Sequence, residues 1–388
     1  MSTMKKPIKI GLLGAGSIMD AHLPGFEAKR DLAVISAVAV NRKTPERVAM
    51  LQEKLGSGVQ VYDSYQALLA ESDVDAVDIL LPHDLHLSAT VAAAKAGKHV
   101  LIEKVMARNV WECDRMIEAC ETNEVTLTVC HDRRYNPEWV TLKRVVESGL
   151  LGKVHFWKLE HNQDVDPKGL GADWIANRDR LGGGAVMSCL THQIDALRWF
   201  GGEVSTVTCT GKVLPERMEG ESIAILACDM ADGALAQLSI NWTTKSGIDT
   251  LREDQAELAK DGLWYEMVQV GGDLGEAYYL AGRGVFVCRR DDRDPRDFVD
   301  CEVPNAPGGF ARVVTEQGIG HPRCVSEWIH KLCHLPAKVV TDGRQVRGTV
   351  EVAEAAGESM RLGRRISLPV VPKPWGDTTQ PETQQSKS

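Results

Sequence analysis

The residues with the clearest chemical potential lie in one predicted helix. The segment GGGAVMSCLTHQIDALRW, residues 182–199, begins with glycines and continues with helix-forming residues. Four side chains at spacings of four, three and four are predicted to share one helix face: Ser188, His192, Asp195 and Trp199. A histidine can accept a hydroxyl proton near neutral pH, and a neighbouring carboxylate can fix its tautomer. This pattern predicts acid–base chemistry by His192 and Asp195; the alternative is a buried histidine bonded to backbone.

A second candidate site lies at the N-terminal glycine loop, in the stretch IGLLGAGSIMDAHLPGF. Gly14 and Gly16 fall between a predicted strand and a predicted helix start. Amides there, including those of Ser17 and Ile18, and the positive end of the helix can hold a pyrophosphate. Met19 stands where a third glycine is usual, which is expected to change helix packing and leave the phosphate contacts in place.

The end of the second predicted strand, VAVNRK, bears on cofactor choice. An acidic residue there binds the ribose hydroxyl of NAD, whereas neutral Asn41 beside Arg42 favours the 2′-phosphate of NADP. Solvated basic residues that open the following helix are the alternative. The expected cofactor is NAD or NADP.

The order of apolar runs predicts two domains. Up to Val129, short apolar strands alternate with amphipathic helices, which indicates an α/β domain with a doubly wound parallel sheet, a Rossmann fold, over residues 1–129. Longer alternating segments from Val154 onward predict an α+β domain with a mostly antiparallel sheet over residues 130–372. The polar residues 373–388 are expected to form a disordered tail.

The composition of the chain limits the kinds of partner that it is expected to bind. The chain of 388 residues is 43% hydrophobic and 26% charged, with a net charge of -9, and no basic run carries interleaved aromatics. These features argue against a nucleic-acid surface, and no stretch approaches the roughly 18 apolar residues of a membrane span. Ten cysteines without a paired CxxC spacing fit reduced thiols and a cytoplasmic location. A small-molecule ligand is expected.

Five segments carry a family resemblance: GAGSIMDAHLP, LPHDLH, AGKHVLIEKVM, RRYNP…SGLLGKV and GGGAVMSCLTHQIDALRWFGG. In order and spacing, over nearly the whole chain, they resemble the glucose–fructose oxidoreductase, inositol dehydrogenase and rhizopine-catabolism (Gfo/Idh/MocA) family. The resemblance implies a Rossmann domain joined to a domain with a large, open, mostly antiparallel sheet. It also implies NAD(P)-dependent redox chemistry on sugars or polyols, and homo-oligomers (dimer, tetramer or larger) formed through that sheet.

The same resemblance assigns roles near the reacting carbon. Glu103 and Lys104 match the family's EKP element, in which the lysine points at the reacting carbon and the nicotinamide; Val105 replaces the proline. An ammonium there can stabilise charge on a carbinol oxygen. The family's catalytic Asp-x-x-x-His places Ser188 where the aspartate stands, so either Asp195 supplies the negative charge or Lys104 and His192 suffice.

Further residues follow from the resemblance. His83 and His86 of LPHDLH match a loop that lines the nicotinamide ribose. Arg134, His161 and Asn162 match positions that meet substrate hydroxyls in inositol dehydrogenases, together with Ser188 and His192; ordinary interdomain polar contacts are the alternative.

One segment has the residue types and spacing of a zinc site. HPRCVSEWIHKLCH contains histidines and cysteines at zinc-like spacing: His321, Cys324, His330, Cys333 and His334. The same segment matches a family helix that precedes a DG turn, so no metal is expected.

Together these features predict an NAD(P)-dependent oxidoreductase that acts on a secondary hydroxyl or ketone of a sugar, glycoside or cyclitol. Lys104 polarises the oxygen and His192 shuttles the proton. One alternative is a closed oxidation–reduction cycle on a glycoside with tightly bound NAD(H). The other is a non-catalytic NAD(P) or sugar sensor, which the departures at Met19, Val105 and Ser188 favour.

Overall fold

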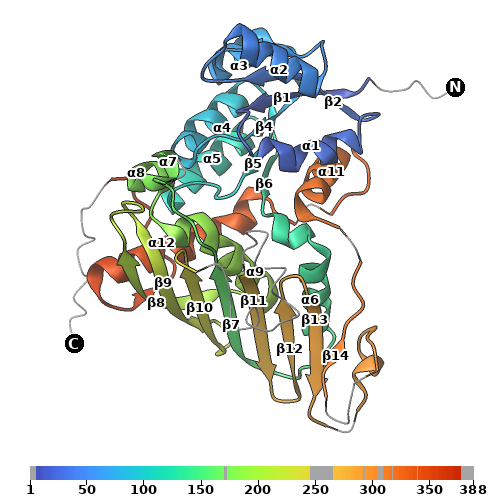
Figure 1. The fold of residues 1–388 in the computed structure, drawn as a ribbon, viewed down its shortest axis with the longest axis vertical. Coiled ribbons are helices and arrows are strands. Elements are labelled where there is room, and N and C mark those ends of the chain that lie inside the picture. Colours follow the sequence, from blue (N-terminus) through green and yellow to red (C-terminus); the bar gives the residue numbers. More distant parts are fainter. Residues whose placement is uncertain are drawn as a thin grey trace, which may run out of the picture.

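The N-terminal part of the computed structural model is a Rossmann domain (Figure 1). The structure describes residues 6–169, 173–244, 265–291, 293–303, 309–316, 318–338 and 340–376. The first sheet has parallel strands in the order β3-β2-β1-β4-β5-β6. Its strands are β1 Ile8–Leu13, β2 Ala33–Ala39, β3 Gln60–Tyr62, β4 Ala76–Ile79, β5 His99–Glu103 and β6 Leu127–Cys130.

Five helices connect these strands, and three of them begin at a side-chain cap. They are α1 Met19–Glu27, α2 Pro45–Leu55, α3 Tyr65–Glu71, α4 His86–Lys95 and α5 Val110–Thr122. The side chains of Thr44, Ser64 and Asn109 accept hydrogen bonds from the first-turn amides of α2, α3 and α5. Each cap fixes the exit of the chain from the loop before its helix.

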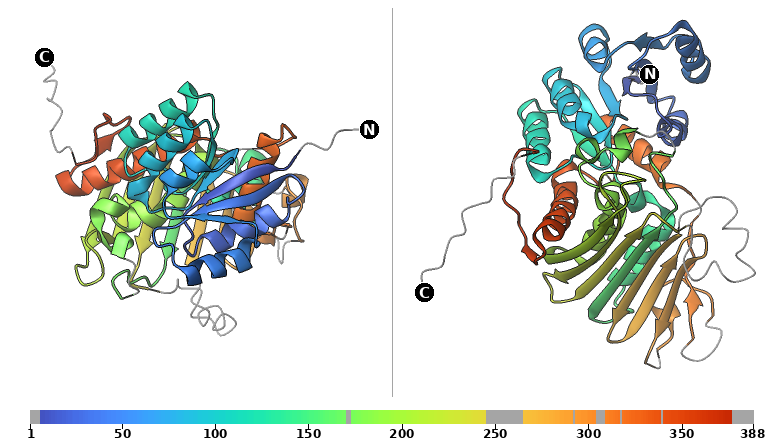
Figure 2. Two further views of the ribbon diagram at one scale, coloured as in Figure 1. Left: turned by 90° about the horizontal axis from the view of Figure 1, so that it is seen from above. Right: turned by 60° about the vertical axis from the view of Figure 1, so that its left-hand side comes forward.

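The second domain contains a large mixed sheet, which lies below the Rossmann domain in Figure 1 and in the right-hand view of Figure 2. Within the described residues its order is β14-β13-β12-β11-β7-β10-β9-β8-β15. Only the β7–β10 pairing among these is parallel. The strands are β7 Val154–Asn162, β8 Val204–Val213, β9 Glu221–Met230, β10 Leu235–Asn241, β11 Tyr265–Gly272, β12 Gly275–Leu280, β13 Gly284–Arg289, β14 Ala311–Arg312 and β15 Ile366–Ser367.

One face of this sheet is covered and the other is open. On β9 and β10, buried residues alternate with exposed ones, as expected of a sheet with one solvated face. The helices of this half of the chain are α6 Pro137–Glu147, α7 Asp173–Ala176, α8 Arg178–Leu181, α9 Thr191–Gly201, α11 Gly320–Leu332 and α12 Gly343–Leu362. Helices α6, α9 and α12 pack on the sheet. The predicted fold class is therefore confirmed.

Helix α11 returns to the first domain although it lies within the segment 130–372. It packs against α1, where Phe26 meets Trp328 edge to face at 6.4 Å between ring centroids. A Cβ on Gly25 would lie 2.6 Å from Cβ of Val325, so the glycine permits this close approach. The return of α11 brings C-terminal residues beside the end of β5.

The ten cysteines are all free. Among the described residues, no helix is both long and apolar enough to cross a bilayer. The proposed tail is described only as far as residue 376, so residues 377–388 lie outside the described part of the chain.

Candidate active site

The glycine loop has one position that requires glycine for the fold and one that leaves space. Gly14 has a φ of 109°, and a Cβ there would lie 2.5 Å from the carbonyl oxygen of Leu80. Gly16 is exposed, and a Cβ there would meet no heavy atom within 4 Å. Ser17 is exposed and Ile18 is half-buried, just before α1 starts at Met19. The end of β1 thus presents an open helix N-terminus of the kind that binds a pyrophosphate.

Met19 is accommodated inside the first domain. Its side chain is buried in the cluster that also contains Ile10 and Leu12. Six residues later, Gly25 permits a different close approach, between α1 and α11. The residues that follow β2, Asn41 and Arg42, are exposed.

The predicted ribose loop is tied to its surroundings by its two histidines. His86 lies between three backbone carbonyls, with Nε2 2.8 Å from Leu81 O and Nδ1 2.9 Å from Val105 O. His83 donates from Nδ1 to Leu181 O at 2.9 Å, and burial lowers its pKa to about 3. These bonds join the β4 loop to the segment after Lys104 and to α8, so both histidines shape the loop.

Lys104 reaches the second domain. Its ammonium donates to the carbonyl oxygen of Ser188 at 2.9 Å, and its backbone amide donates to the carboxylate of Glu103. The peptide bond between Lys104 and Val105 is cis. Ser188 itself lies in a π-type turn, Val186–Leu190, directly before α9. The predicted single helix face is interrupted there, and Ser188 offers its carbonyl toward the lysine.

His192 lies at the start of α9 and is buried, with a side-chain exposure of 8%. Burial lowers its pKa well below the ordinary value, and the charges of Lys104 and Arg133 lower it further. At neutral pH the imidazole is therefore neutral and able to accept a proton. The carboxylate that faces it is Asp132, with Oδ1 3.5 Å from Nδ1 of His192.

Asp195 faces elsewhere, which corrects the expected pairing with His192. Its two oxygens accept a bidentate pair of hydrogen bonds from Arg134, at 2.7 and 2.8 Å, and one from Thr349 at 2.8 Å. Burial raises the pKa of Asp195, but Arg134 outweighs burial and lowers it. Arg134 also donates to Val340 O at 2.6 Å. This buried ion pair joins the 3₁₀ helix η2, Asp132–Tyr135, to α9 and to α12, so Arg134 is engaged within the protein.

A buried carboxylate that sequence reasoning missed organises the predicted substrate side. Glu266 of β11 accepts hydrogen bonds at Oε1 from Arg133 at 2.9 Å, Gln193 at 3.1 Å and His161 at 3.2 Å. Burial raises its pKa, but Arg133 and His161 bring it down to about 2. Glu266 therefore holds three hydrogen-bonding side chains from separate elements in one place.

Asn162 is the remaining predicted substrate residue. It follows His161 on β7 and donates from its amide to Glu160 Oε1 at 2.8 Å.

A second missed cluster lies beneath the glycine loop. His22 of α1 is fully buried between Asp78 and Glu103, with 2.8 Å from Nδ1 and from Nε2 to the nearest carboxylate oxygens. Burial opposes protonation, but the two carboxylates raise the pKa of His22 well above its ordinary value. Burial likewise raises the pKa of Glu103, and His22 lowers it to about 2. His22 thus fixes the residue that precedes Lys104. The histidine in DAHLPGF was the signal for it.

In the described residues, the histidines and cysteines of α11 with zinc-like spacing do not gather around one point as metal ligands would. His321 faces Glu103 and Asp132, at 3.7 and 3.5 Å. Its ligand atom lies within 4.8 Å of those of His22, Glu103 and Cys130. The His22–Glu103 contact is already a hydrogen bond. The bond with Cys324, together with burial, raises the pKa of the Cys130 thiol, which keeps the thiol protonated. This arrangement suits a proton network better than a metal.

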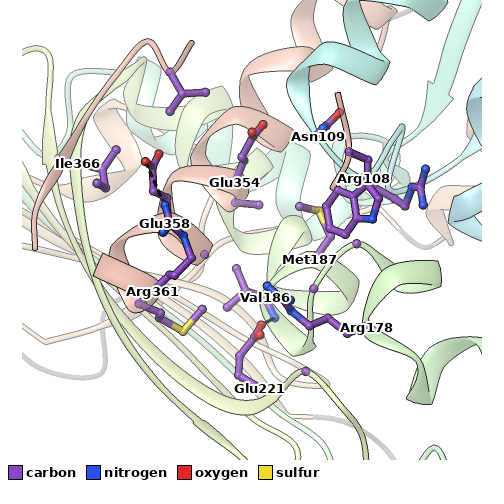
Figure 3. Close-up of a pocket in the computed structure, with 18 of the residues that line it drawn as sticks. Arg108, Asn109, Arg178, Val186, Met187, Glu221, Glu354, Glu358, Arg361 and Ile366 are labelled. Atoms are coloured by element: carbon purple, nitrogen blue, oxygen red, sulfur yellow. Dashed lines mark hydrogen bonds and ion pairs between the residues drawn. The ribbon is translucent and has the colours of Figure 1, made fainter. Parts of the chain in front are cut away.

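A separate cavity of about 820 Å³ lies between α8, α12, β8 and the segment that follows β15. Figure 3 shows charged side chains of both signs around it, among them Arg178, Arg361, Glu221 and Glu354. Neither Lys104 nor His192 lines this cavity. It is distinct from the site built around β5 and α9.

Comparison with known proteins places this geometry in a family. Residues 8–131 match the family model of an oxidoreductase family with an NAD-binding Rossmann fold, and residues 139–258 match the Gfo/Idh/MocA C-terminal domain. The chain is 30% identical over 247 residues to myo-inositol 2-dehydrogenase of Thermotoga maritima, covering 62% of this chain and 71% of that protein. It is 27% identical over 331 residues to inositol 2-dehydrogenase of Streptomyces avermitilis, covering 81% and 92%.

Solved structures share the fold. Levoglucosan dehydrogenase in complex with NADH and levoglucosan has a TM-score of 0.77 at 19% identity, covering 94% of this chain and 100% of that one. The WlbA dehydrogenase of Bordetella pertussis in complex with NADH and UDP-GlcNAcA has a TM-score of 0.76 at 22% identity, with the same coverage. The chain is an NAD-binding oxidoreductase by class, and it belongs to the Gfo/Idh/MocA family.

Proposed function

We propose that this protein transfers hydride between NAD(P) and a secondary hydroxyl or ketone of a sugar, glycoside or cyclitol. The observation that carries this proposal is that Lys104, directly after β5, donates to the carbonyl oxygen of Ser188, four residues before His192 of α9. The residues present fit the cofactor, because the loop after β1 keeps its required glycine and leaves Gly16 open. When bound, the nicotinamide accepts or supplies the hydride.

The chain's own groups handle charge and protons. The ammonium of Lys104 stabilises negative charge on the reacting oxygen, and neutral His192 takes the hydroxyl proton. The low pKa of His192 keeps it free as a base at neutral pH. Asp195 and Arg134 stabilise the fold around α9, so we assign Asp195 a positioning role and not a catalytic one.

The substrate class rests on the groups that Glu266 gathers. Arg133, Gln193 and His161 present donors and acceptors from η2, α9 and β7, an arrangement suited to a polyhydroxylated ring. The names of the relatives, inositol and levoglucosan dehydrogenases, support the same class.

Two finer features accompany the proposal. The exposed Arg42 next to Asn41 favours use of NADP as well as NAD. The open sheet face carries Phe156 beside Leu235, exposed by 37% and 56%, and Ile225 on β9. We expect this face to join copies of the chain into a homo-oligomer, in keeping with a cytoplasmic enzyme.

The decisive experiment combines purified protein with NAD or NADP and a panel of sugars, glycosides and inositols, and follows the absorbance of the reduced nicotinamide. Lys104→Met is expected to lower kcat by at least about 10²-fold, because its charge acts in the transition state. Lys95→Met, at the exposed end of α4, is the matched control. Cofactor binding without turnover for every compound would instead support the sensor, and turnover without added cofactor would support the closed cycle. Equal rates for the two variants would overturn the mechanism.

A further inference from the structure

Two polar atoms at the active site are buried without partners and face each other. Nδ1 of His192 and Oδ1 of Asp132 make no hydrogen bond within the described residues, and they lie 3.5 Å apart. An unpaired buried polar atom is costly, so a facing pair of them calls for an explanation. Catalytic hydrogen bonds are often long in unliganded enzymes and shorten when the substrate binds. This geometry fits a proton-transfer contact between His192 and Asp132 that shortens when the substrate binds.

The contact continues to a group that solvent can reach. The other oxygen of Asp132, which accepts a hydrogen bond from the Arg133 guanidinium, lies 3.5 Å from Nδ1 of His321. Helix α11 brings His321 across from the C-terminal part of the chain. Asp132 has an exposure of 3% and His192 of 8%, whereas His321 is 22% exposed. His321 is therefore the member of this chain of contacts through which a proton can reach water.

We propose that Asp132 and His321 relay the proton of His192 between the active site and solvent. This inference rests on the proposed function, because it supplies the proton that alcohol oxidation releases. It assigns no substrate contact to either residue, so both act through His192.

The steps balance for oxidation. The substrate O–H bond breaks and an N–H bond forms on Nε2 of His192. A bound NAD(P)⁺ would supply the acceptor for the hydride that leaves the carbon bearing that hydroxyl. The N–H bond at Nδ1 of His192 then breaks and an O–H bond forms on Oδ1 of Asp132. The carboxyl group then rotates, so that its unprotonated oxygen takes over the hydrogen bond from Arg133 and its O–H faces His321. That O–H bond breaks as an N–H bond forms on Nδ1 of His321, and the Nε2–H bond of His321 breaks to give a proton to water. Ketone reduction runs the same steps in reverse.

The surroundings of His321 suit a transient imidazolium. Glu103 of β5 lies 3.7 Å from its Nε2, and Asp132 of η2 faces its Nδ1. His22 of α1 lies at a tilt with 5.7 Å between ring centroids, and its positive charge is balanced by Asp78 and Glu103. Cys130 of β6 completes the group. Because Glu103 is held ionised by His22, one carboxylate stays near each nitrogen of His321.

Around His192 the charges have the opposite sign. Lys104 and Arg133 disfavour its protonated form, together with any charge on His131 and His161. A proton taken up by His192 is thus driven toward the carboxylate and then toward His321. The direction of transfer follows from this difference between the two ends.

The test compares His321→Gln with His330→Gln. His330 is on the same helix, α11, but on a different face. With a substrate that the wild-type enzyme turns over, His321→Gln is expected to lower kcat about tenfold or more and to leave KM little changed. The pH profile of His321→Gln is expected to differ from that of His330→Gln, and added imidazole or small buffers restore part of the rate. Rates that equal those of His330→Gln at every pH, with no buffer rescue, would refute the relay. Absence of turnover in wild type would count against the proposed function alone.

A second measurement needs no turnover. In protein labelled with ¹⁵N-histidine, the pH dependence of the His192 ring resonances is expected to change in His321→Gln and to stay as in wild type in His330→Gln. The same pH dependence of the His192 resonances in all three proteins would overturn the proposal even if no substrate were known.

Discussion

Gly14 and Gly16 lie two residues apart in the same loop, yet alanine should harm them in different ways. At Gly14, alanine is forced into a φ of 109°, with its Cβ 2.5 Å from Leu80 O. Strain at such a position costs on the order of 1–3 kcal/mol, and the collision with backbone adds to it. Gly14→Ala should therefore lower the free energy of unfolding by about 3 kcal/mol or more, measured by urea denaturation.

Gly16→Ala should leave stability within about 0.5 kcal/mol of wild type, because a Cβ there has no neighbour within 4 Å. Its Cβ enters the space assigned to the pyrophosphate, so NADH should bind at least about tenfold more weakly, a loss of about 1.4 kcal/mol. Gly58→Ala, equally without a neighbour within 4 Å, is the control for both assays. Wild-type NADH affinity in Gly16→Ala would refute this placement of the cofactor, and wild-type stability in Gly14→Ala would refute the steric argument.

Three further substitutions test other parts of the structure. Asp195→Asn removes the charge that balances buried Arg134 and should cost about 3–5 kcal/mol of stability in thermal unfolding; an unchanged Tm with lost activity would restore Asp195 to a direct catalytic role. Arg42→Ala should weaken NADP binding and spare NAD in fluorescence titrations, and equal effects on both would argue against a 2′-phosphate contact. His83 has a pKa lowered from 6.5 to about 3, so the unfolded state binds its proton first and stability falls as pH drops below 6.5. His83→Gln should therefore flatten the loss of stability below that pH, by up to about 1.4 kcal/mol per pH unit; an unchanged acid profile would contradict the buried neutral form.

The sequence predicted the fold class because its signals are local. Apolar strands that alternate with amphipathic helices indicate the Rossmann domain, and segments of alternating polarity indicate the mostly antiparallel sheet, whose β9 and β10 show the corresponding alternation of burial over most of their length. Gly14, Gly16 and Lys104 also stand out locally, since a turn conformation and a motif need only neighbouring residues. The part of the predicted helix that holds His192 and Asp195 is present as α9, whereas Ser188 lies in the π-type turn before it.

What the sequence alone could not decide is which side chains meet across the two domains. Spacing on a helix suggested that the Asp195 carboxylate pairs with His192. Instead, Arg134 of η2 donates to both oxygens of Asp195, and Asp132 faces the histidine. Glu266 and His321 come from β11 and α11, more than a hundred residues from His161 and Asp132 in the chain. Only the tertiary packing places them there, because contacts between distant segments follow from how sheets and helices fill space and leave no periodic trace in the sequence.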